Sequence, residues 1–209
     1  TESMYLGPKF SNSLILKEIK KNRLKYIKIR YPEKFVAKKL LEGFVVACFQ
    51  GRMEFGPRAL GNRSILVSAA DKSVNEWLNT KLKRTEFMPF APITLKRYAN
   101  KMYKNLSKKK LASKFMTITT ECTKEAIKIS PAAVHIDNTA RPQIITIKDN
   151  KKIYNILNEY YKISKIPNLI NTSFNVHEEP IVCTPDDAVR AFKTSKLDFL
   201  YIEDYIVYR

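Results

Sequence analysis

The feature that most constrains the fold of this chain is a glycine-rich loop between two short apolar runs. Three of the five glycines in the 209-residue sequence lie at positions 51, 56 and 61, and none follows Gly61. The runs at 44–49 and 64–67 are typical of buried strands. Because glycine adopts backbone conformations that other residues rarely reach, the sequence predicts two strands joined by a tightly folded loop.

The loop carries residues suited to binding an anion. It contains Arg52, Arg58 and Arg63 together with one carboxylate, Glu54. Guanidinium groups and open backbone N–H groups hold phosphate or carboxylate oxygens. The alternative is a structural connection whose arginines pair with Glu54 and with solvent, since surface arginines are common.

The loop is not a nucleotide-binding P-loop. Gly56 and Gly61 have the separation of that motif, but Asn62 and Arg63 stand where its lysine and its serine or threonine belong. No G-x-G-x-x-G occurs in the sequence. Any anion binding must therefore use another arrangement.

Length and composition indicate a globular protein. With 44% apolar residues, the chain suits one domain, 1–209, with a sizeable core. No apolar run approaches the ~18 residues of a membrane span, and the first residues lack the pattern of a secretory signal. The three cysteines are widely spaced, as is typical of reduced residues in a cytoplasmic protein.

The net charge of +18 has two interpretations. A basic face binds nucleic acid in some proteins, whereas a lysine-rich surface is often only a solvated face. The solvated surface is favoured here, since no nucleic-acid motif accompanies the charge. We expect segment 97–114 to be a mobile excursion. It contains the densest basic cluster, Lys101, Lys104, Lys108, Lys109, Lys110 and Lys114.

Hydrophobic periodicity predicts an α/β fold with a twisted mixed sheet flanked by helices. Caps and apolar faces predict helices at 11–22, 32–43, 71–83 and 151–162 and from 184 onward. Strands are predicted at 44–49, 64–67, 90–95, 115–122, 132–137, 143–148, 167–170 and 199–208. Pro92 is expected to confine its strand to a sheet edge or a bulge.

The candidate site residues are cations and amides near strand ends, where α/β folds place ligands. No Cys/His pair has metal-ligand spacing, which argues against a metal centre. This set suits phosphoryl or nucleotidyl transfer, in which catalysis is mostly positioning and charge neutralisation. The candidates are Arg52, Arg58, Arg63, Lys81, Lys83, Arg84, Arg141, Asn171, Ser173 and Asn175.

Four ordered motifs resemble the C-terminal domain of the O-carbamoyltransferases, the family of nodulation and antibiotic carbamoyltransferases. The longest is G-R-M-E-F-G-P-R-A-L-G-N-R-S at 51–64. The others are P-F-A-P at 89–92, H-I-D-N-T-A-R-P-Q at 135–143, and N-T-S-F-N at 171–175, which leads into E-P-I-V at 179–182. The resemblance covers nearly the whole chain.

The resemblance implies a YrdC-like fold and a defined chemistry. The domain would bind ATP, with Mg²⁺ accompanying the nucleotide, and carbamoyl phosphate, and would form carbamoyl adenylate. An N-terminal domain similar to actin-like ATPases, in the same polypeptide or a separate chain, would pass the carbamoyl group to a hydroxyl acceptor. This chain would contain only the YrdC-like domain, which binds no metal through its own side chains. The chain could also form a homodimer.

By motif match, the resemblance assigns catalytic roles to Arg58, Lys81 and Arg141. The two arginines would contact phosphate, and Lys83 is a substitute for Lys81. The residues that would bind substrate or nucleotide are Arg52, Arg63, Lys83, Asn171, Ser173 and Asn175. Two positions depart from the family: Met88 stands where arginine is frequent, and Asn138 where glycine is common.

Two other functions remain open from the sequence. A YrdC-like module that binds RNA or nucleotide would explain the basic charge. A scaffold that only completes a partner domain would need no ligand. Binding of ATP with magnesium favours the enzyme, and salt-dependent binding of mixed RNA favours the nucleic-acid module.

Overall fold

The computed structural model describes residues 3–81, 90–106, 111–176 and 178–209. The helices are α1 (Asn12–Lys21), α2 (Pro32–Leu41), α3 (Ser73–Lys81), α4 (Ala99–Met102), α5 (Lys124–Ile129), α6 (Lys151–Ser164) and α7 (Pro185–Thr194). The strands are β1 (Lys25–Lys28), β2 (Val46–Phe49), β3 (Arg63–Val67), β4 (Ala91–Leu95), β5 (Thr120–Glu121), β6 (Thr139–Ala140), β7 (Gln143–Ile145), β8 (Asn168–Ser173), β9 (Phe199–Ile202) and β10 (Tyr205–Tyr208).

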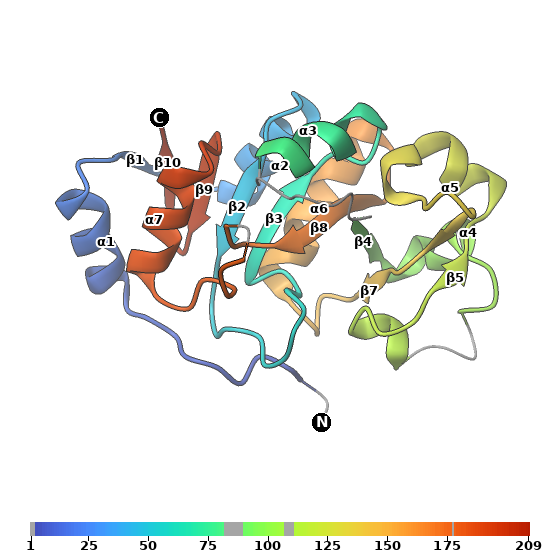
Figure 1. The fold of residues 1–209 in the computed structure, drawn as a ribbon, viewed down its shortest axis with the longest axis horizontal. Coiled ribbons are helices and arrows are strands. Elements are labelled where there is room, and N and C mark those ends of the chain that lie inside the picture. The colour runs from blue at the N-terminus through green and yellow to red at the C-terminus, as the bar shows by residue number, and fades with distance from the viewer. Residues whose placement is uncertain (1–2, 82–89, 107–110, 177) are drawn as a thin grey trace.

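One eight-stranded sheet organises the molecule, in the order β1-β10-β9-β2-β3-β8-β4-β7. The pairs β2–β9 and β4–β7 are parallel, and the other neighbours are antiparallel. Figure 1 shows this sheet running across the molecule with helices on both sides. The predicted mixed α/β fold with flanking helices is confirmed.

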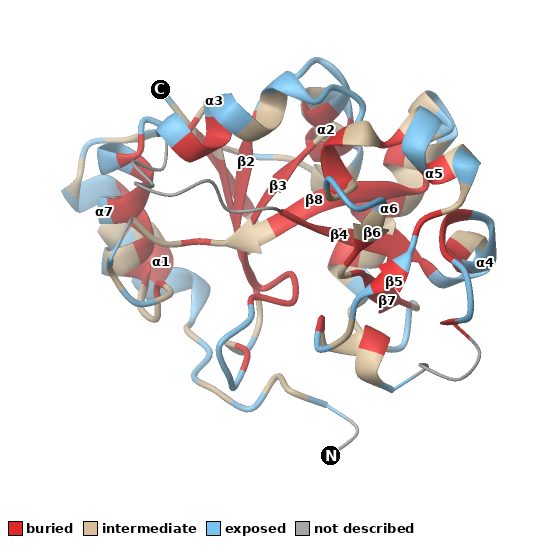
Figure 2. Ribbon diagram, turned by 45° about the vertical axis from the view of Figure 1, so that its right-hand side comes forward, coloured by how far each residue is buried: buried red, intermediate tan, exposed pale blue. Residues whose placement is uncertain are grey.

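Helices cover both faces of the sheet because side chains alternate along each strand. On β2, Ala47 and Phe49 pack in the core beneath α1 and α7, whereas Val46 and Cys48 pack in the core beneath α2 and α6. This alternation is the period-2 geometry of a strand. Figure 2 shows the resulting buried centre, with the strands coloured as buried and the outer helix faces as exposed.

A smaller lobe lies beside β4 and β7 at the far end of the sheet (Figure 1). It contains α4, α5 and the short pair β5–β6, and it has its own core, which includes Met102, Tyr103 and Cys122. The expectation of a mobile excursion is therefore wrong for residues 99–106, whose apolar side chains pack into this core. Lys108, Lys109 and Lys110 lie outside the described residues.

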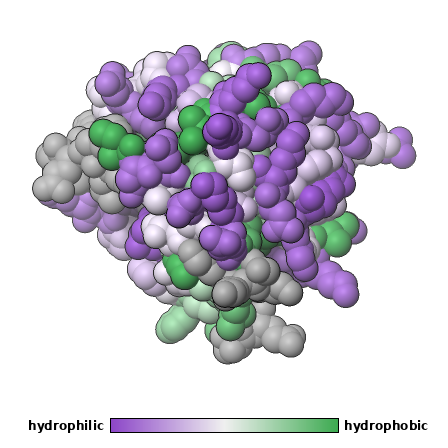
Figure 3. Space-filling model, turned by 90° about the vertical axis from the view of Figure 1, so that its right-hand side faces the viewer, coloured by the Kyte–Doolittle hydropathy of each residue, from purple (hydrophilic) through white to green (hydrophobic). Residues whose placement is uncertain are grey.

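Two lysines of the basic cluster in this lobe pair with acidic side chains. Lys101 lies 3.2 Å from Glu125, and Lys104 lies 2.9 Å from Glu121. Figure 3 shows that hydrophilic side chains dominate this face of the molecule. The pairing supports a solvated face, because neutralised lysines contribute little to a nucleic-acid surface.

Four predicted strands differ from the structure. Segment 115–122 is extended only at β5, because Met116 has a left-handed backbone, and segment 132–137 begins in a 3₁₀ helix at Pro131–Ala133. Segment 199–208 is a hairpin, β9–β10, and not one strand. β4 lies inside the sheet and not at an edge; Pro92 is tolerated because β7 pairs only with Ile93–Leu95.

The helix predictions are confirmed for α1, α2, α6 and α7, and for the described part of segment 71–83, where α3 lies. β1 and α5 were not predicted. None of the helices in the described part of the chain is long and apolar enough to cross a membrane.

Candidate functional site

The glycine-rich loop between β2 and β3 has a closed base built around Glu54. One carboxylate oxygen of Glu54 accepts hydrogen bonds from the backbone N–H groups of Leu60, Asn62 and Arg63, at 2.7, 2.7 and 3.3 Å. The expectation that open N–H groups of this loop would hold an anion is therefore wrong for these three positions. The glycines allow the folding: Gly61 has φ +119°, and a Cβ there would lie 2.7 Å from Ile153 of α6.

Arg63 lies inside the protein and not on a ligand surface. Its side chain is fully buried, and it donates to the carbonyl oxygens of Gln50 and Asn62 at 2.8 and 3.0 Å. Burial lowers the pKa of Arg63 to about 10, which leaves the guanidinium charged at neutral pH. The hydrogen bonds of Arg63 hold β2 and β3 together at the mouth of the loop, and contact of Arg63 with substrate stays a prediction.

Arg52 is also engaged within the chain. Residues 4–8 run beside the loop, with hydrogen bonds from Gly7 N to Met53 O and from Phe55 N to Met4 O at 2.9 and 2.7 Å. Arg52 donates to the carbonyl of Leu6 at 2.8 Å. The segment before α1 thus packs along the loop, and the hydrogen bond from Arg52 to Leu6 helps to keep it there.

Four of the predicted site residues come together in one small pocket, which we call the anion pocket. It lies where β8 ends and antiparallel β4 begins, and Arg58 from the exposed loop tip and Arg141 from the turn before β7 reach it. Its volume of about 70 Å³ exceeds the ~30 Å³ share of a liquid water, so it has room for a small anionic group. The residues that line it are Pro57, Arg58, Ala59, Phe90, Ala91, Met116, Arg141, Asn171, Thr172 and Ser173.

The anion pocket has an excess of positive charge. Burial, and secondarily the charge of Arg58, lower the pKa of Arg141. The Nε of Arg141 and the Oδ1 of Asn171 are buried without a hydrogen-bond partner among the described residues. In that part of the chain, neither Arg58 nor Arg141 forms an ion pair with a carboxylate. Two cations held together without a counter-ion are the arrangement that a bound anion stabilises.

Ser173 and Asn175 form the end of the loop after β8. The hydroxyl of Ser173 donates to Asn175 Oδ1 at 2.6 Å, and Asn175 Nδ2 donates to the carbonyls of Val176 and Glu179 at 3.0 Å each. The side chain of Asn175 therefore stabilises the loop that contains it. Ser173 lines the anion pocket and keeps acceptor capacity there.

A larger cavity, about 640 Å³, lies on the other side of Phe90, which lines both spaces. Its walls come from the start of α3 and from segment 132–137, with polar groups from Asn75, His135 and Asp137. His135 Nδ1 lies 3.1 Å from the hydroxyl of Thr139, across a turn in which Asn138 has φ +60°. Asparagine thus tolerates the left-handed conformation at this position, where the family commonly has glycine.

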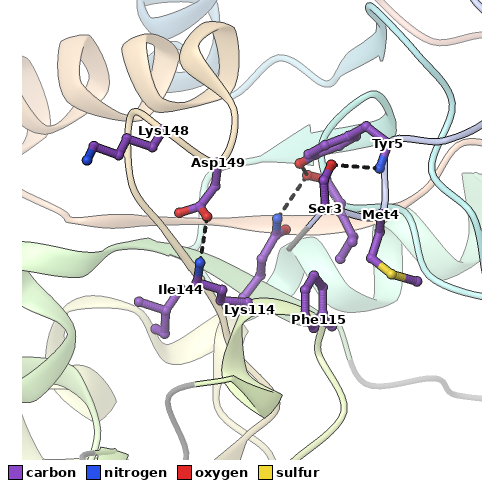
Figure 4. A pocket seen from close by; sticks show the side chains of 10 residues that line it. Ser3, Met4, Tyr5, Lys114, Phe115, Ile144, Lys148 and Asp149 are labelled. Carbon is purple, nitrogen blue, oxygen red and sulfur yellow. Dashed lines mark hydrogen bonds and ion pairs between the residues drawn. The ribbon is translucent and has the colours of Figure 1, made fainter. Parts of the chain in front are cut away.

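A third cavity, of about 70 Å³, is lined by Leu60, Gln143 and the residues labelled in Figure 4. Lys114 and Asp149 form an ion pair of 2.9 Å at its edge, and Tyr5 donates to the carbonyl of Leu60 at 2.9 Å. Gln143 connects this region to the anion pocket, since it donates to Leu60 O and accepts from Asn171 Nδ2.

Two predicted lysines cannot be placed in the site. Lys81 is the last residue of α3, and nothing is described of its side chain; Lys83, like Arg84 and Met88, lies outside the described residues. In the described ranges, no group of three or more His, Cys, Asp or Glu side chains is arranged to hold a metal ion.

Sequence reasoning missed Glu54 and Gln143 as residues that shape the site. The sequence suggests Glu54 only as a partner for arginines, because its acceptor role depends on N–H groups six to nine positions later. A signal exists in retrospect: Glu54 is the one acidic residue in a fourteen-residue segment with three arginines. Gln143 ends the third motif, with no pattern that would assign it a partner.

Comparisons with known proteins agree with the motifs. Residues 37–209 match the family described as Carbamoyltransferase C-terminus. Uncharacterized protein MJ1058 of Methanocaldococcus jannaschii is 39% identical over 215 residues, covering 100% of this chain and 34% of that protein. Nodulation protein NolNO of Sinorhizobium fredii is 36% identical over 169 residues, covering 80% of this chain and 25% of that protein.

The fold also has a counterpart among solved structures. The crystal structure of full-length HypF in the phosphate- and nucleotide-bound form matches with a TM-score of 0.60 at 21% identity, covering 87% of this chain and 22% of HypF. The chain spans about a third of the length of the first curated relatives that it matches. The match of 173 consecutive residues, 37–209, shows that this chain belongs to the carbamoyltransferase family, in the part described as its C-terminus.

Proposed function

We propose that this chain binds ATP and carbamoyl phosphate and forms carbamoyl adenylate for O-carbamoylation of a hydroxyl acceptor. The observation that carries the proposal is the anion pocket, where Arg58 and Arg141 approach each other without a carboxylate partner in the described residues. A phosphate or carbamate group between them would neutralise both charges. Arginine suits this task, because its planar fork matches two oxygens at once.

In the proposed reaction, water releases carbamate and phosphate from carbamoyl phosphate. A carbamate oxygen then attacks the α-phosphorus of ATP, so that one O–P bond forms as the bond to pyrophosphate breaks. Negative charge builds on the phosphate oxygens during both steps. Positioned guanidinium groups stabilise such charge, and Mg²⁺ accompanying the nucleotide would neutralise the departing pyrophosphate.

The larger cavity is our candidate for the nucleoside part of ATP. Its volume of about 640 Å³ lies within the ~300–1,000 Å³ of small-molecule sites, and apolar walls with a few polar groups are typical of them. Phe90 lines this cavity and the anion pocket, so one ligand could extend across both. The nucleotide-bound HypF structure adds indirect support, as its fold is similar.

The transfer to a hydroxyl acceptor is assigned to a partner domain similar to actin-like ATPases. The alignments cover 34%, 40% and 36% of the first curated relatives, so these proteins are about three times as long as this chain. A second domain could therefore supply the acceptor site. This chain, as the only protein in the reaction, is expected to carbamoylate no acceptor.

Calorimetric titration with Mg-ATP and with carbamoyl phosphate tests the proposal, together with phosphorus NMR of the products. We expect each ligand to bind, and pyrophosphate to appear only when both are present. The double variant Arg58→Ala/Arg141→Ala should release no pyrophosphate, whereas Arg30→Ala, which removes an exposed arginine beside Tyr31, should behave like the parent. A parent protein that binds neither ligand would overturn the proposal.

A further inference from the structure

The glycine-rich loop is divided into two parts with different hydrogen bonding. We call residues 59–63 the loop base and residues 55–58 the loop tip. In the base, the N–H groups of Leu60, Asn62 and Arg63 bond to Glu54, and the N–H of Gly61 bonds to Ser64 Oγ at 2.9 Å. In the tip, Phe55 to Arg58 are all exposed. The base is thus fixed from within, and the tip carries Arg58 to the anion pocket.

The arrangement of the base resembles an occupied anion site. Several backbone N–H groups converge on one carboxylate oxygen, which is the geometry of a backbone nest around a phosphate or carboxylate. The occupant here belongs to the chain itself. Glu54 is only 4% exposed, and its second oxygen is buried without a partner in the described part of the chain. Burial raises the pKa of Glu54, and its N–H donors and Arg63 oppose that rise.

A buried carboxyl group with one unbonded oxygen is costly for stability, so its presence in the loop needs a reason. The base contacts the anion pocket directly, because Asn171 Nδ2 donates to the carbonyl of Ala59 at 3.2 Å. It also contacts α6, because Asn150 donates to Asn62 Oδ1 at 2.7 Å. The conformation that Glu54 imposes on the base therefore sets where the tip begins and ends.

We propose that Glu54 is a positioning residue that fills the backbone anion site of the loop and thereby directs the substrate's anionic group to Arg58 and Arg141. This inference rests on the proposed function for its ligand. If the nest were empty, a phosphate could bind to the N–H groups of the base instead of the arginines. With Glu54 in place, only the side-chain cations remain available.

Glu54→Ala, in the full 209-residue chain, tests the inference, with Mg-ATP as the probe. We expect ATP affinity in chloride to fall by about tenfold, equivalent to about 1.4 kcal/mol. Replacing chloride by formate at constant ionic strength should restore several-fold of that loss, because formate fits the space vacated by the carboxyl group. Glu54→Gln, which keeps an acceptor oxygen, should lose less affinity than Glu54→Ala.

Asp187→Ala provides the matched control. Asp187 also accepts two backbone N–H bonds, from Cys183 and Thr184 at 3.2 and 2.9 Å, but it caps α7 and does not line the anion pocket. We expect this variant to lose stability without losing ATP affinity and to show no response to formate. A purely structural role for Glu54 would make the two variants behave alike, which would overturn the inference.

A second readout does not depend on ATP. The amide protons of Leu60 and Asn62 should move upfield in Glu54→Ala and return toward their parental shifts in formate. If the parent protein bound no ATP but these shifts followed formate, the proposed function would fail while the internal occupation of the nest would stand. Amide shifts that ignored both the substitution and formate would overturn the role of Glu54 itself.

Discussion

At the scale of single residues, arginines in one sequence motif have different tasks. Arg63 is buried and bonded to backbone carbonyls, Arg52 fastens the N-terminal segment, and Arg58 lies exposed beside Arg141. Burial distinguishes Arg63 from the other two, whereas the two exposed arginines differ because Arg52 donates to the carbonyl of Leu6.

Arg58→Ala and Arg141→Ala should each weaken ATP binding by about 1.5–3 kcal/mol, the range for a hydrogen bond to a charged group. Arg→Lys at either position should recover little of that loss, because an ammonium group cannot reproduce the planar fork. Calorimetry gives the affinities, and circular dichroism checks that the variants are folded. ATP affinities equal to the parental value in both alanine variants would contradict the assignment.

Arg63→Met should lower the free energy of unfolding by about 1–3 kcal/mol, the cost of one buried carbonyl left without its donor. That carbonyl belongs to Gln50, because the carbonyl of Asn62 still accepts from Gln50 N at 2.9 Å. Urea denaturation measures the loss. Arg52→Met, at an exposed side chain with one bond to Leu6, is the control and should cost far less.

At the scale of elements, local capping fixes where several helices begin. The side chain of Thr184 accepts from Asp187 N at 3.2 Å, and Asp187 bonds back to the backbone of Thr184, which completes a capping box at α7. This arrangement satisfies N–H groups that the first helical turn leaves open.

Thr184→Ala should destabilise the protein by about 1 kcal/mol, the usual effect of losing an N-cap side chain. Thermal unfolding with matched buffers measures the change. Ser11→Ala removes the cap of α1, whose bond to Leu14 N is longer, 3.4 Å, and exposed, so a smaller loss is expected there. Equal losses at the two helices would contradict the role of bond geometry.

The turn at 135–139 should make stability depend on pH. Burial, as the largest cause, lowers the pKa of His135 below its ordinary value of 6.5. The folded state thus favours neutral His135, so this contribution is fully present above pH 6.5 and is lost as pH falls through the folded pKa. Urea denaturation at several pH values from about 7.5 to about 5 gives the free energy of unfolding of the parent and of His135→Asn. The parental value should fall more steeply toward low pH than that of the variant. A parental slope equal to that of the variant would contradict the prediction.

The sequence predicted elements whose signals are local, and missed those that depend on distant contacts. The amphipathic face of α6 and the capped start of α7 were visible in the order of residues. The β9–β10 hairpin was not, because Glu203 turns the chain with φ +46° where no glycine or asparagine announces a turn. In the site, motifs identified Arg58 and Arg141, but nothing local could show that Arg63 is buried or that Glu54 bonds to the loop base.

At the scale of the whole molecule, the positive charge is spread over the surface and not gathered in one patch. The net charge of +18 spreads over the surface, and Lys101, Lys104 and Lys114 of the smaller lobe each pair with an acidic residue. The protein should therefore attract anions over its whole surface, without one defined surface for binding nucleic acid.

The chain should bind mixed-sequence RNA only non-specifically, with Kd of about 10⁻⁴–10⁻⁶ M at physiological salt. The affinity should fall steeply as salt rises, as expected for counterion release. Fluorescence anisotropy with labelled RNA measures both. Nanomolar binding that persists at high salt would instead support an RNA-binding module.

The anion pocket has a consequence for the order of events during synthesis. Its walls come from residues 57–59, 90–91, 116, 141 and 171–173, which span more than half of the chain. Contacts between such distant segments form late, because long loops must close first. The nascent chain must therefore emerge from the ribosome as far as Ser173 before it can bind an anion in this pocket. Ligand in the cell can stabilise the finished fold by mass action but cannot assist its first steps.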